Sequence, residues 1–221
     1  MIPTFGYGSP PRTDLIVYDD MLGASGDDLN TRASSYGGTP SRLSPYTSAA
    51  KLDGSGGVYG NATNSAYYWP SASVANGDYT VTGLFNLVTK TSGSRFGLMT
   101  RVDDSVTNSP GKFYLFRWNN GNFELLRIQY GGTGGSGLTL ATAVAFSMSA
   151  GDSPWLRLQA TGTGTVTIIA DRSTDGQSWT NVFNVAQSTN SPIVTAGKPG
   201  LFLDEAASGS TLTHCQLFLA A

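Results

Sequence analysis

The chain has 221 residues, of which 13% are charged and 39% apolar, and its formal net charge at pH 7 is −2. Plentiful aromatic residues and few charges are the reverse of a disordered composition. The balanced charge excludes the basic footprint that nucleic acid or an anionic membrane surface requires. One cysteine cannot form an internal disulfide, and no apolar run approaches the ~20 residues that cross a bilayer.

The first segment, residues 1–14, differs in composition from the rest of the chain. It holds three prolines, and the Pro10-Pro11 pair cannot join a central strand. It also lacks the charged and apolar regions of a signal peptide, so we expect a protein that is made in the cytoplasm and not exported by a signal peptide. We therefore predict an extended N-terminal arm over residues 1–14 and one β domain over residues 15–221.

Beyond the arm, short apolar segments alternate with Gly, Asn, Ser and Asp turns at the spacing of a sandwich or barrel. The clearest predicted strand is 138–148, where Leu138, Leu140, Val144, Phe146 and Met148 share one face. Further strands are expected at 14–19, 66–69, 78–89, 95–102, 155–161, 165–172, 179–185, 199–204 and 211–219.

A hairpin is predicted around Asn120-Gly121, a pair that favours a two-residue type I′ turn. This turn sets Trp118 opposite Phe123 and places Arg117 opposite Glu124, a complementary charge pair that supports the register. The strand leading into it is apolar on both faces over 113–116, so we expect one sheet to be covered on its outer side as well. A second turn is predicted at Asp175-Gly176.

No segment has the caps and periodicity of an amphipathic helix of three turns. No repeat of 20–50 residues is evident either. The predicted fold class is all-β, an antiparallel two-sheet β-sandwich with an extended N-terminal arm.

Residues suited to catalysis are scarce. Glu124 and Glu205 are the only glutamates, and Glu124 already has a predicted partner in Arg117, which favours its ionised form. The single histidine, His214, is expected to be structural, and Cys215 to be a small buried side chain. The glycine-rich stretch 131–137 lacks the Lys-Ser/Thr of a phosphate loop. We therefore predict a protein without enzymatic activity, cofactor or metal.

Calcium binding is the less favoured alternative to a protein that binds no metal. Calcium takes six to eight oxygen ligands, and loop aspartates with a neighbouring hydroxyl supply them. The residues that could contribute are Asp27, Asp28, Asp171, Ser173 and Asp175, although the sequence contains no EF-hand loop.

Two aromatic segments could bind a glycan, because sugar faces stack on rings and sugar hydroxyls bond to amides. The candidate contacts are Tyr68, Trp69, Trp118 and Asn119. Three consecutive aromatics in a strand must point to both faces, so at least one of 67–69 is expected to face outward. Packing of these rings in the core is the favoured alternative.

Several segments in chain order together resemble the concanavalin A-like lectin/glucanase, or LamG-like, jelly roll. They are VYDDMLGASGDDLNTR (17–32), RFGLMTRVDD (95–104), WLRLQATGTGTVTIIAD (155–171) and GKPGLFLDE (197–205). In that family an Asp-Asp strand opens the sandwich, and a GxxGL strand comes shortly before the last one. STDGQSW (173–179) also resembles the hairpin of Asp-box modules, which implies a turn at Asp175 and Gly176 with Trp179 packed beneath it.

The hydrolases of that family carry a Glu-x-Asp-x-x-Glu strand, which this sequence lacks. The resemblance therefore implies either a binding module or one of the sandwich domains found in bacteriophage virion proteins. The first expectation is a capsid decoration (cement) protein, a homo-oligomer and most readily a trimer, bound to the major capsid protein or another virion protein. Its arm would supply the contacts, through Ile2, Pro3, Phe5, Tyr7, Pro10, Pro11 and Arg12. The alternative is a carbohydrate-binding module or a glycan or host-receptor binder on a tail appendage.

Overall fold

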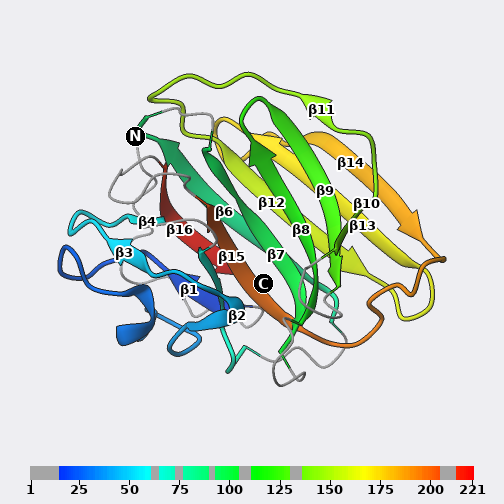
Figure 1. Cartoon of the computed structure of the whole chain (residues 1–221), viewed down its shortest axis with the longest axis horizontal. Coiled ribbons are helices and arrows are strands. Elements are labelled where there is room, and N and C mark those ends of the chain that lie inside the picture. Colours follow the sequence, from blue (N-terminus) through cyan, green and yellow to red (C-terminus); the bar gives the residue numbers. More distant parts are fainter. Residues whose placement is uncertain are drawn as a thin grey trace.

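The computed structural model describes residues 15–60, 65–72, 77–89, 93–104, 111–129, 136–204 and 213–221, with the backbone alone at 44–47, 136, 213, 214, 217 and 219. Within these ranges the chain forms two antiparallel sheets packed face to face and one 3₁₀ turn, Leu29–Thr31 (Figure 1). No helix in the described ranges has the length and apolar character of a membrane span. The predicted all-β, two-sheet sandwich is confirmed.

One sheet, called sheet A here, has the strand order β14-β13-β12-β6-β16-β4-β3, and β1 also pairs with β16. Its strands are β1 (Val17–Asp19), β3 (Ala50–Leu52), β4 (Val58–Gly60), β6 (Tyr79–Leu87), β12 (Trp155–Thr161), β13 (Val166–Ser173), β14 (Thr180–Gln187) and β16 (Thr213–Ala220).

The other, sheet B, has the order β10-β9-β8-β7-β15-β5-β2, with β11 paired to β9. Its strands are β2 (Ser41–Thr47), β5 (Ser65–Tyr68), β7 (Arg95–Asp103), β8 (Lys112–Asn119), β9 (Asn122–Gln129), β10 (Ser136–Thr139), β11 (Val144–Ala145) and β15 (Lys198–Asp204).

The main core lies between the two sheets and follows from alternation along each strand. In β6, Val81, Phe85 and Leu87 are buried, while Thr80 and Thr82 on the other face are half-exposed. Alternate residues point to opposite faces of a sheet, so each strand contributes every second side chain to this layer. Sheet A is thus apolar inside and largely polar outside.

The central part of sheet B has buried apolar side chains on both faces. Tyr114 and Phe116 of β8 join the main core, whereas Phe113 and Leu115 belong to a second apolar cluster. The expectation from 113–116 that this sheet is covered on its outer side is confirmed. We call this second cluster the outer apolar cluster; its members are Leu43, Ala66, Met99, Val102, Phe113, Leu115, Leu126, Ile128 and Phe202.

The predicted β8–β9 hairpin is confirmed in detail. Asn120 and Gly121 have φ angles of 39° and 112°, both positive as a type I′ turn requires. Trp118 pairs with Phe123, and Arg117 with Glu124.

The continuous strand predicted over 138–148 is wrong. The segment forms the short strands β10 and β11, which pair with different parts of β9 along the edge of sheet B. Between and after them, Leu140, Phe146 and Met148 pack against the main core, and this pulls the segment out of the sheet. The strands β2, β3 and β4 have no counterpart among the predicted ones, because β3 and β4 have three residues each and β2 lacks an alternating apolar pattern.

Candidate functional site

A network of charged and amide side chains crosses four adjacent strands on the outer face of sheet B, at the end nearest the β8–β9 turn. Strand pairing places its members side by side: Asp204 lies opposite Arg95, and Arg95 lies opposite Asn119. One pair further along, Arg117 lies opposite Glu124. We call these five residues the polar network.

Hydrogen bonds join the five groups into one chain. Arg95 Nη1 lies 2.8 Å from Asp204 Oδ2, and Arg95 Nε donates to Asn119 Oδ1 at 3.0 Å. Asn119 Nδ2 donates to Glu124 Oε1 at 2.8 Å. Arg117 Nε donates to Glu124 Oε2 at 2.8 Å, and its Nη2 lies 2.7 Å from the same oxygen. Each side chain is therefore held in place by a neighbour on the next strand.

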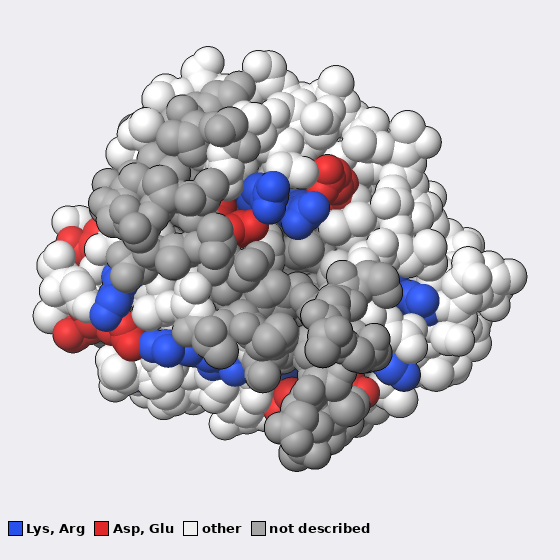
Figure 2. Space-filling view, in the orientation of Figure 1, with Lys and Arg blue, Asp and Glu red and all other residues white. Residues whose placement is uncertain are grey.

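In the strand order of sheet B, the guanidinium groups of Arg95 and Arg117 lie between Asp204 and Glu124. Figure 2 shows two basic side chains next to each other on this face, with an acidic side chain on either side. The Arg95 side chain is 39% exposed, whereas Asp204 is 4% exposed. Arg117 and Glu124 are both about one-fifth exposed, at 19% and 22%. A ligand approaching from solvent thus meets positive charge first at the Arg95 end.

Gly97 leaves the space beside Arg117 free of a side chain. It pairs with Arg117 on one side and with Phe202 on the other. A Cβ at this position would lie 2.2 Å from the Phe116 carbonyl oxygen, so only glycine fits. The Arg117 guanidinium reaches across and lies 6.0 Å from the centre of the Phe202 ring, at the outer limit of a cation–π contact.

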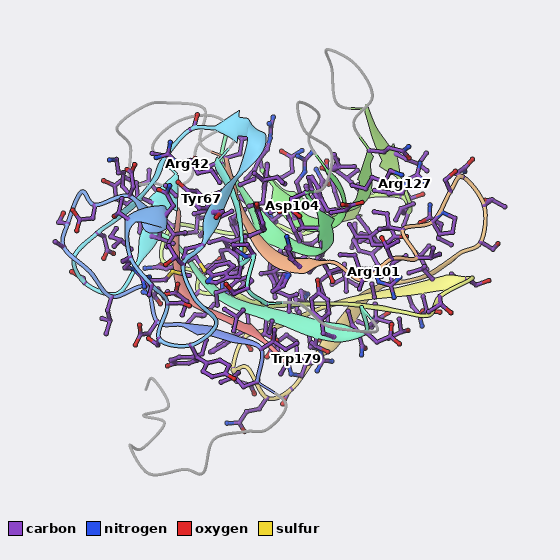
Figure 3. The ribbon with its side chains drawn as sticks, turned by 90° about the horizontal axis from the view of Figure 1, so that it is seen from below. Arg42, Tyr67, Arg101, Asp104, Arg127 and Trp179 are labelled. Atoms are coloured by element: carbon purple, nitrogen blue, oxygen red, sulfur yellow. The ribbon has the colours of Figure 1, made fainter. Side chains whose placement is uncertain are left out.

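A second polar group lies at the opposite end of the same face, where β15 begins and β7 ends. Lys198 Nζ lies 2.6 Å from Asp104 Oδ1 and 5.2 Å from the centre of the Tyr68 ring. Burial, together with its hydrogen bond to Asp104, raises the pKa of Tyr68 to about 12. Partial burial opposes ionisation of Asp104, but hydrogen bonds from Lys198 and Tyr68 outweigh it and lower the pKa of Asp104. Asp104 lies on the sheet B side of the molecule in Figure 3.

Two of the four predicted glycan contacts are wrong. Trp69 and Trp118 have no solvent exposure. Trp69 stacks on Phe218 with ring centres 4.2 Å apart, and Trp118 Nε1 donates to the Phe146 carbonyl at 2.9 Å. Both rings fill the main core, because a large apolar side chain gains more free energy there than at the surface.

The other two predicted contacts, Tyr68 and Asn119, adjoin the buried tryptophans and are half-exposed. Asn119 belongs to the polar network, and Tyr68 to the opposite end of the same face. The prediction placed tryptophan rather than charged residues in the candidate site, and whether Tyr68 and Asn119 contact a glycan stays a prediction. Four members of the polar network were not among the predicted contacts. Of these, only Arg117 and Glu124 could be linked from the sequence, by their predicted pairing across the hairpin.

A third polar group lies on the outer face of sheet A, on the opposite side of the molecule from Asp104 (Figure 3). Arg157 Nη2 lies 2.8 Å from Asp171 Oδ2, and Asn181 donates to the other carboxylate oxygen at 2.9 Å. The Arg157 guanidinium lies 4.3 Å from the centre of the Trp179 ring. The Asp-box resemblance implied that Trp179 packs beneath the turn at Gly176, and this expectation is wrong. Trp155 lies against that turn, whereas Trp179 packs on Arg157.

The carboxylates considered for calcium have other partners. Asp28 is paired with Arg42 and Lys51, and Asp171 with Arg157. Asp175 accepts backbone hydrogen bonds from Ser178 and Gln177, which lower its pKa. Within the described ranges, no three acidic, histidine or cysteine side chains gather in a way that could hold a metal ion. Cys215 is buried, and the side chain of His214 lies outside what the structure describes.

The residues predicted to contact a capsid or a second subunit all lie outside the described part of the chain. These are Ile2, Pro3, Phe5, Tyr7, Pro10, Pro11 and Arg12. The capsid-decoration function, its oligomeric state and its virion location therefore stay predictions.

No family model and no curated protein sequence matches the chain. Solved structures do share its fold. A carbohydrate-binding module, CBM66 from Bacillus subtilis, is 14% identical with a TM-score of 0.50, over 95% of this chain and 96% of that one. The alginate lyase Aly36B, solved with an alginate tetrasaccharide, is 13% identical with a TM-score of 0.54, over 92% and 95%.

An engineered GH43 glycoside hydrolase with endo-xylanase and exo-arabinofuranosidase activity is 12% identical, with a TM-score of 0.55. It matches 98% of this chain, which spans only 42% of the length of that enzyme. At these identities the likeness establishes the fold, a two-sheet antiparallel β-sandwich of the kind seen in carbohydrate-active proteins, and nothing more specific.

Proposed function

We propose that the protein binds carbohydrate through the polar network on the outer face of sheet B and breaks no bond in it. The observation that carries this proposal is the network itself: two guanidinium groups, an amide and two carboxylates held side by side on four rigid strands. Planar donors and acceptors of this kind suit the paired hydroxyl groups of a sugar, and a sheet fixes them more firmly than a loop does.

The solved structures that share the fold support carbohydrate as the ligand class. One of them is a carbohydrate-binding module and another was solved with an alginate oligosaccharide. Both match nearly the whole of this chain, so the comparison is between units of similar size.

The bonding of the network favours binding over catalysis. Both carboxylate oxygens of Glu124 accept hydrogen bonds from N–H donors, one from Asn119 and one from Arg117. This arrangement suits a fixed carboxylate rather than an acid that delivers a proton to a leaving group. Asp204 is in turn held against Arg95.

Binding to an array of polysaccharides, followed by calorimetry on the best ligand, tests the proposal. Arg95→Ala and Asn119→Ala are each expected to weaken binding by tenfold or more, since each removes a charged or amide contact. Arg157→Ala is the matched control, because Arg157 is also paired with an aspartate and is 35% exposed, but on the other sheet. Equal loss of binding in the control, or unchanged binding in both network variants, contradicts the proposed site.

A further inference from the structure

The polar network presents more positive than negative charge to solvent, although it contains two residues of each sign. Asp204 lies beneath Arg95 and is almost completely buried, so its negative charge is screened from a ligand by the guanidinium above it. At the other end, Arg117 and Glu124 are about equally exposed. The unequal exposure at one end leaves the outward surface of the network cationic.

Both guanidinium groups also have donors that the network does not use. Arg95 bonds through Nε and Nη1, and Arg117 through Nε and Nη2. Among the described residues, no hydrogen bond reaches Arg95 Nη2 or Arg117 Nη1. Since the other nitrogens are held by Asn119, Asp204 and Glu124, the planes of both groups are fixed before a ligand arrives.

The two cations are neighbours. They lie on adjacent strands β7 and β8, and Arg117 pairs with Gly97, which has no side chain to separate them. An anion that accepts hydrogen bonds from their outward N–H groups gains charge-assisted bonds, which are stronger than those that a neutral hydroxyl group accepts.

We infer that the sugar bound at this network carries a carboxylate, as a uronic acid does, and that the carboxylate lies against the outward N–H groups of Arg95 and Arg117. This inference rests on the proposed carbohydrate-binding function. A carboxylate has two oxygens, so it can accept one charge-assisted hydrogen bond from the outward nitrogen of each guanidinium.

Calorimetry with matched pairs of oligosaccharides tests this inference. Oligomers of galacturonate, glucuronate and mannuronate are each compared with the same oligomer after its carboxyl groups have been reduced to neutral hydroxymethyl groups. At least one acidic oligomer is expected to bind tenfold or more tightly than its reduced form, and the difference should shrink as salt is raised. Arg117→Gln should remove most of this preference. Arg157→Gln, which changes an arginine on sheet A, should retain it.

The outcomes separate the two proposals. If the acidic oligomers and their reduced forms bind equally well, or if a sulfated neutral oligomer binds as tightly as the uronate, the carboxylate inference is overturned while the carbohydrate-binding function stands. If no oligomer in either form binds and the polysaccharide array is also negative, the proposed function fails and the inference fails with it. Circular dichroism of each variant shows that the sandwich has formed.

Discussion

Arg101 donates a hydrogen bond from Nη2 to Asp78 Oδ1 at 2.9 Å, which joins β7 of sheet B to the residue just before β6 of sheet A. The same guanidinium donates to the backbone carbonyls of Gly77, Ile193 and Gly162. Arg101 is completely buried, lies at a bulge in β7 and has a φ angle of 53°. One side chain thus ties three loops to sheet B near the end of β7.

Arg101→Met is expected to lower the free energy of unfolding by about 3 kcal/mol, because it leaves buried carbonyl groups without their donor. Asp78→Asn should cost less, about 1 kcal/mol, since Asp78 is 42% exposed and water can replace part of its contact. Urea denaturation measures both. Equal effects would show that the ion pair, rather than the carbonyl contacts, holds this end together.

Trp69→Ala and Trp118→Ala should each lower the free energy of unfolding by about 3–5 kcal/mol, since each empties a large volume in the main core. Trp179→Ala, on the outer face of sheet A, is the control and should cost roughly 1 kcal/mol from its lost contact with Arg157. Thermal unfolding followed by circular dichroism compares the three. A small effect for either core variant would contradict the burial of that ring.

The ionisation of Tyr68 should make stability depend on pH in the alkaline range. Its pKa is raised from 10.0 to about 12. Between these values the unfolded chain loses the phenolic proton while the folded chain keeps it, so the stabilisation is present below pH 10 and is lost as pH rises toward 12. Asp104→Asn removes the neighbouring charge and should lower the pKa of Tyr68. Titration of the tyrosine ring carbons by NMR checks this; an unchanged pKa would mean that burial alone is responsible.

Gly97→Ala should destabilise the protein by about 1–3 kcal/mol, because the new Cβ would overlap the backbone of β8 at Phe116 and Arg117. It should also weaken glycan binding, since Arg117 must move. Gly164→Ala is the matched control: a Cβ there has no atom within 4 Å. Denaturation and calorimetry of the two variants are compared at the same temperature. Wild-type binding by Gly97→Ala would show that Arg117 does not need its present position.

The capsid-decoration prediction has a separate test. Deleting residues 1–13 should abolish binding to phage particles and leave the β-sheet circular dichroism signal unchanged, because all the strands of the described sandwich lie at Val17 or beyond. Full occupancy of particles by the truncated protein would refute the arm hypothesis. Unchanged glycan binding by the same truncated protein is expected if the polar network is the ligand site.

Local signals explain what the sequence predicts well. The β8–β9 hairpin depends on two turn residues and the pairs beside them, all within a few positions of each other. The break between β10 and β11 is different, because it depends on how Leu140 and Phe146 pack against distant parts of the core. Short edge strands such as β3 carry too few residues for a period to be visible.

The candidate site shows the same difference between contacts set by local sequence and contacts set by long-range strand pairing. Arg117 and Glu124 are predicted to pair because the hairpin sets them opposite each other. Arg95 and Asp204 are 109 residues apart, and only the strand order of sheet B brings them together. The tryptophan prediction failed for a related reason: alternation tells which residues share a face, but not which face is turned to solvent.

The separation of Arg95 from Asp204 along the chain has a practical consequence. Because β15 must pair with β7 before the two side chains meet, neither half of the chain carries the complete network, and a proteolytic fragment of either half should be inactive. Occupancy of the network therefore reports on global folding, so ligand affinity chromatography would select intact molecules and discard truncated or misassembled ones.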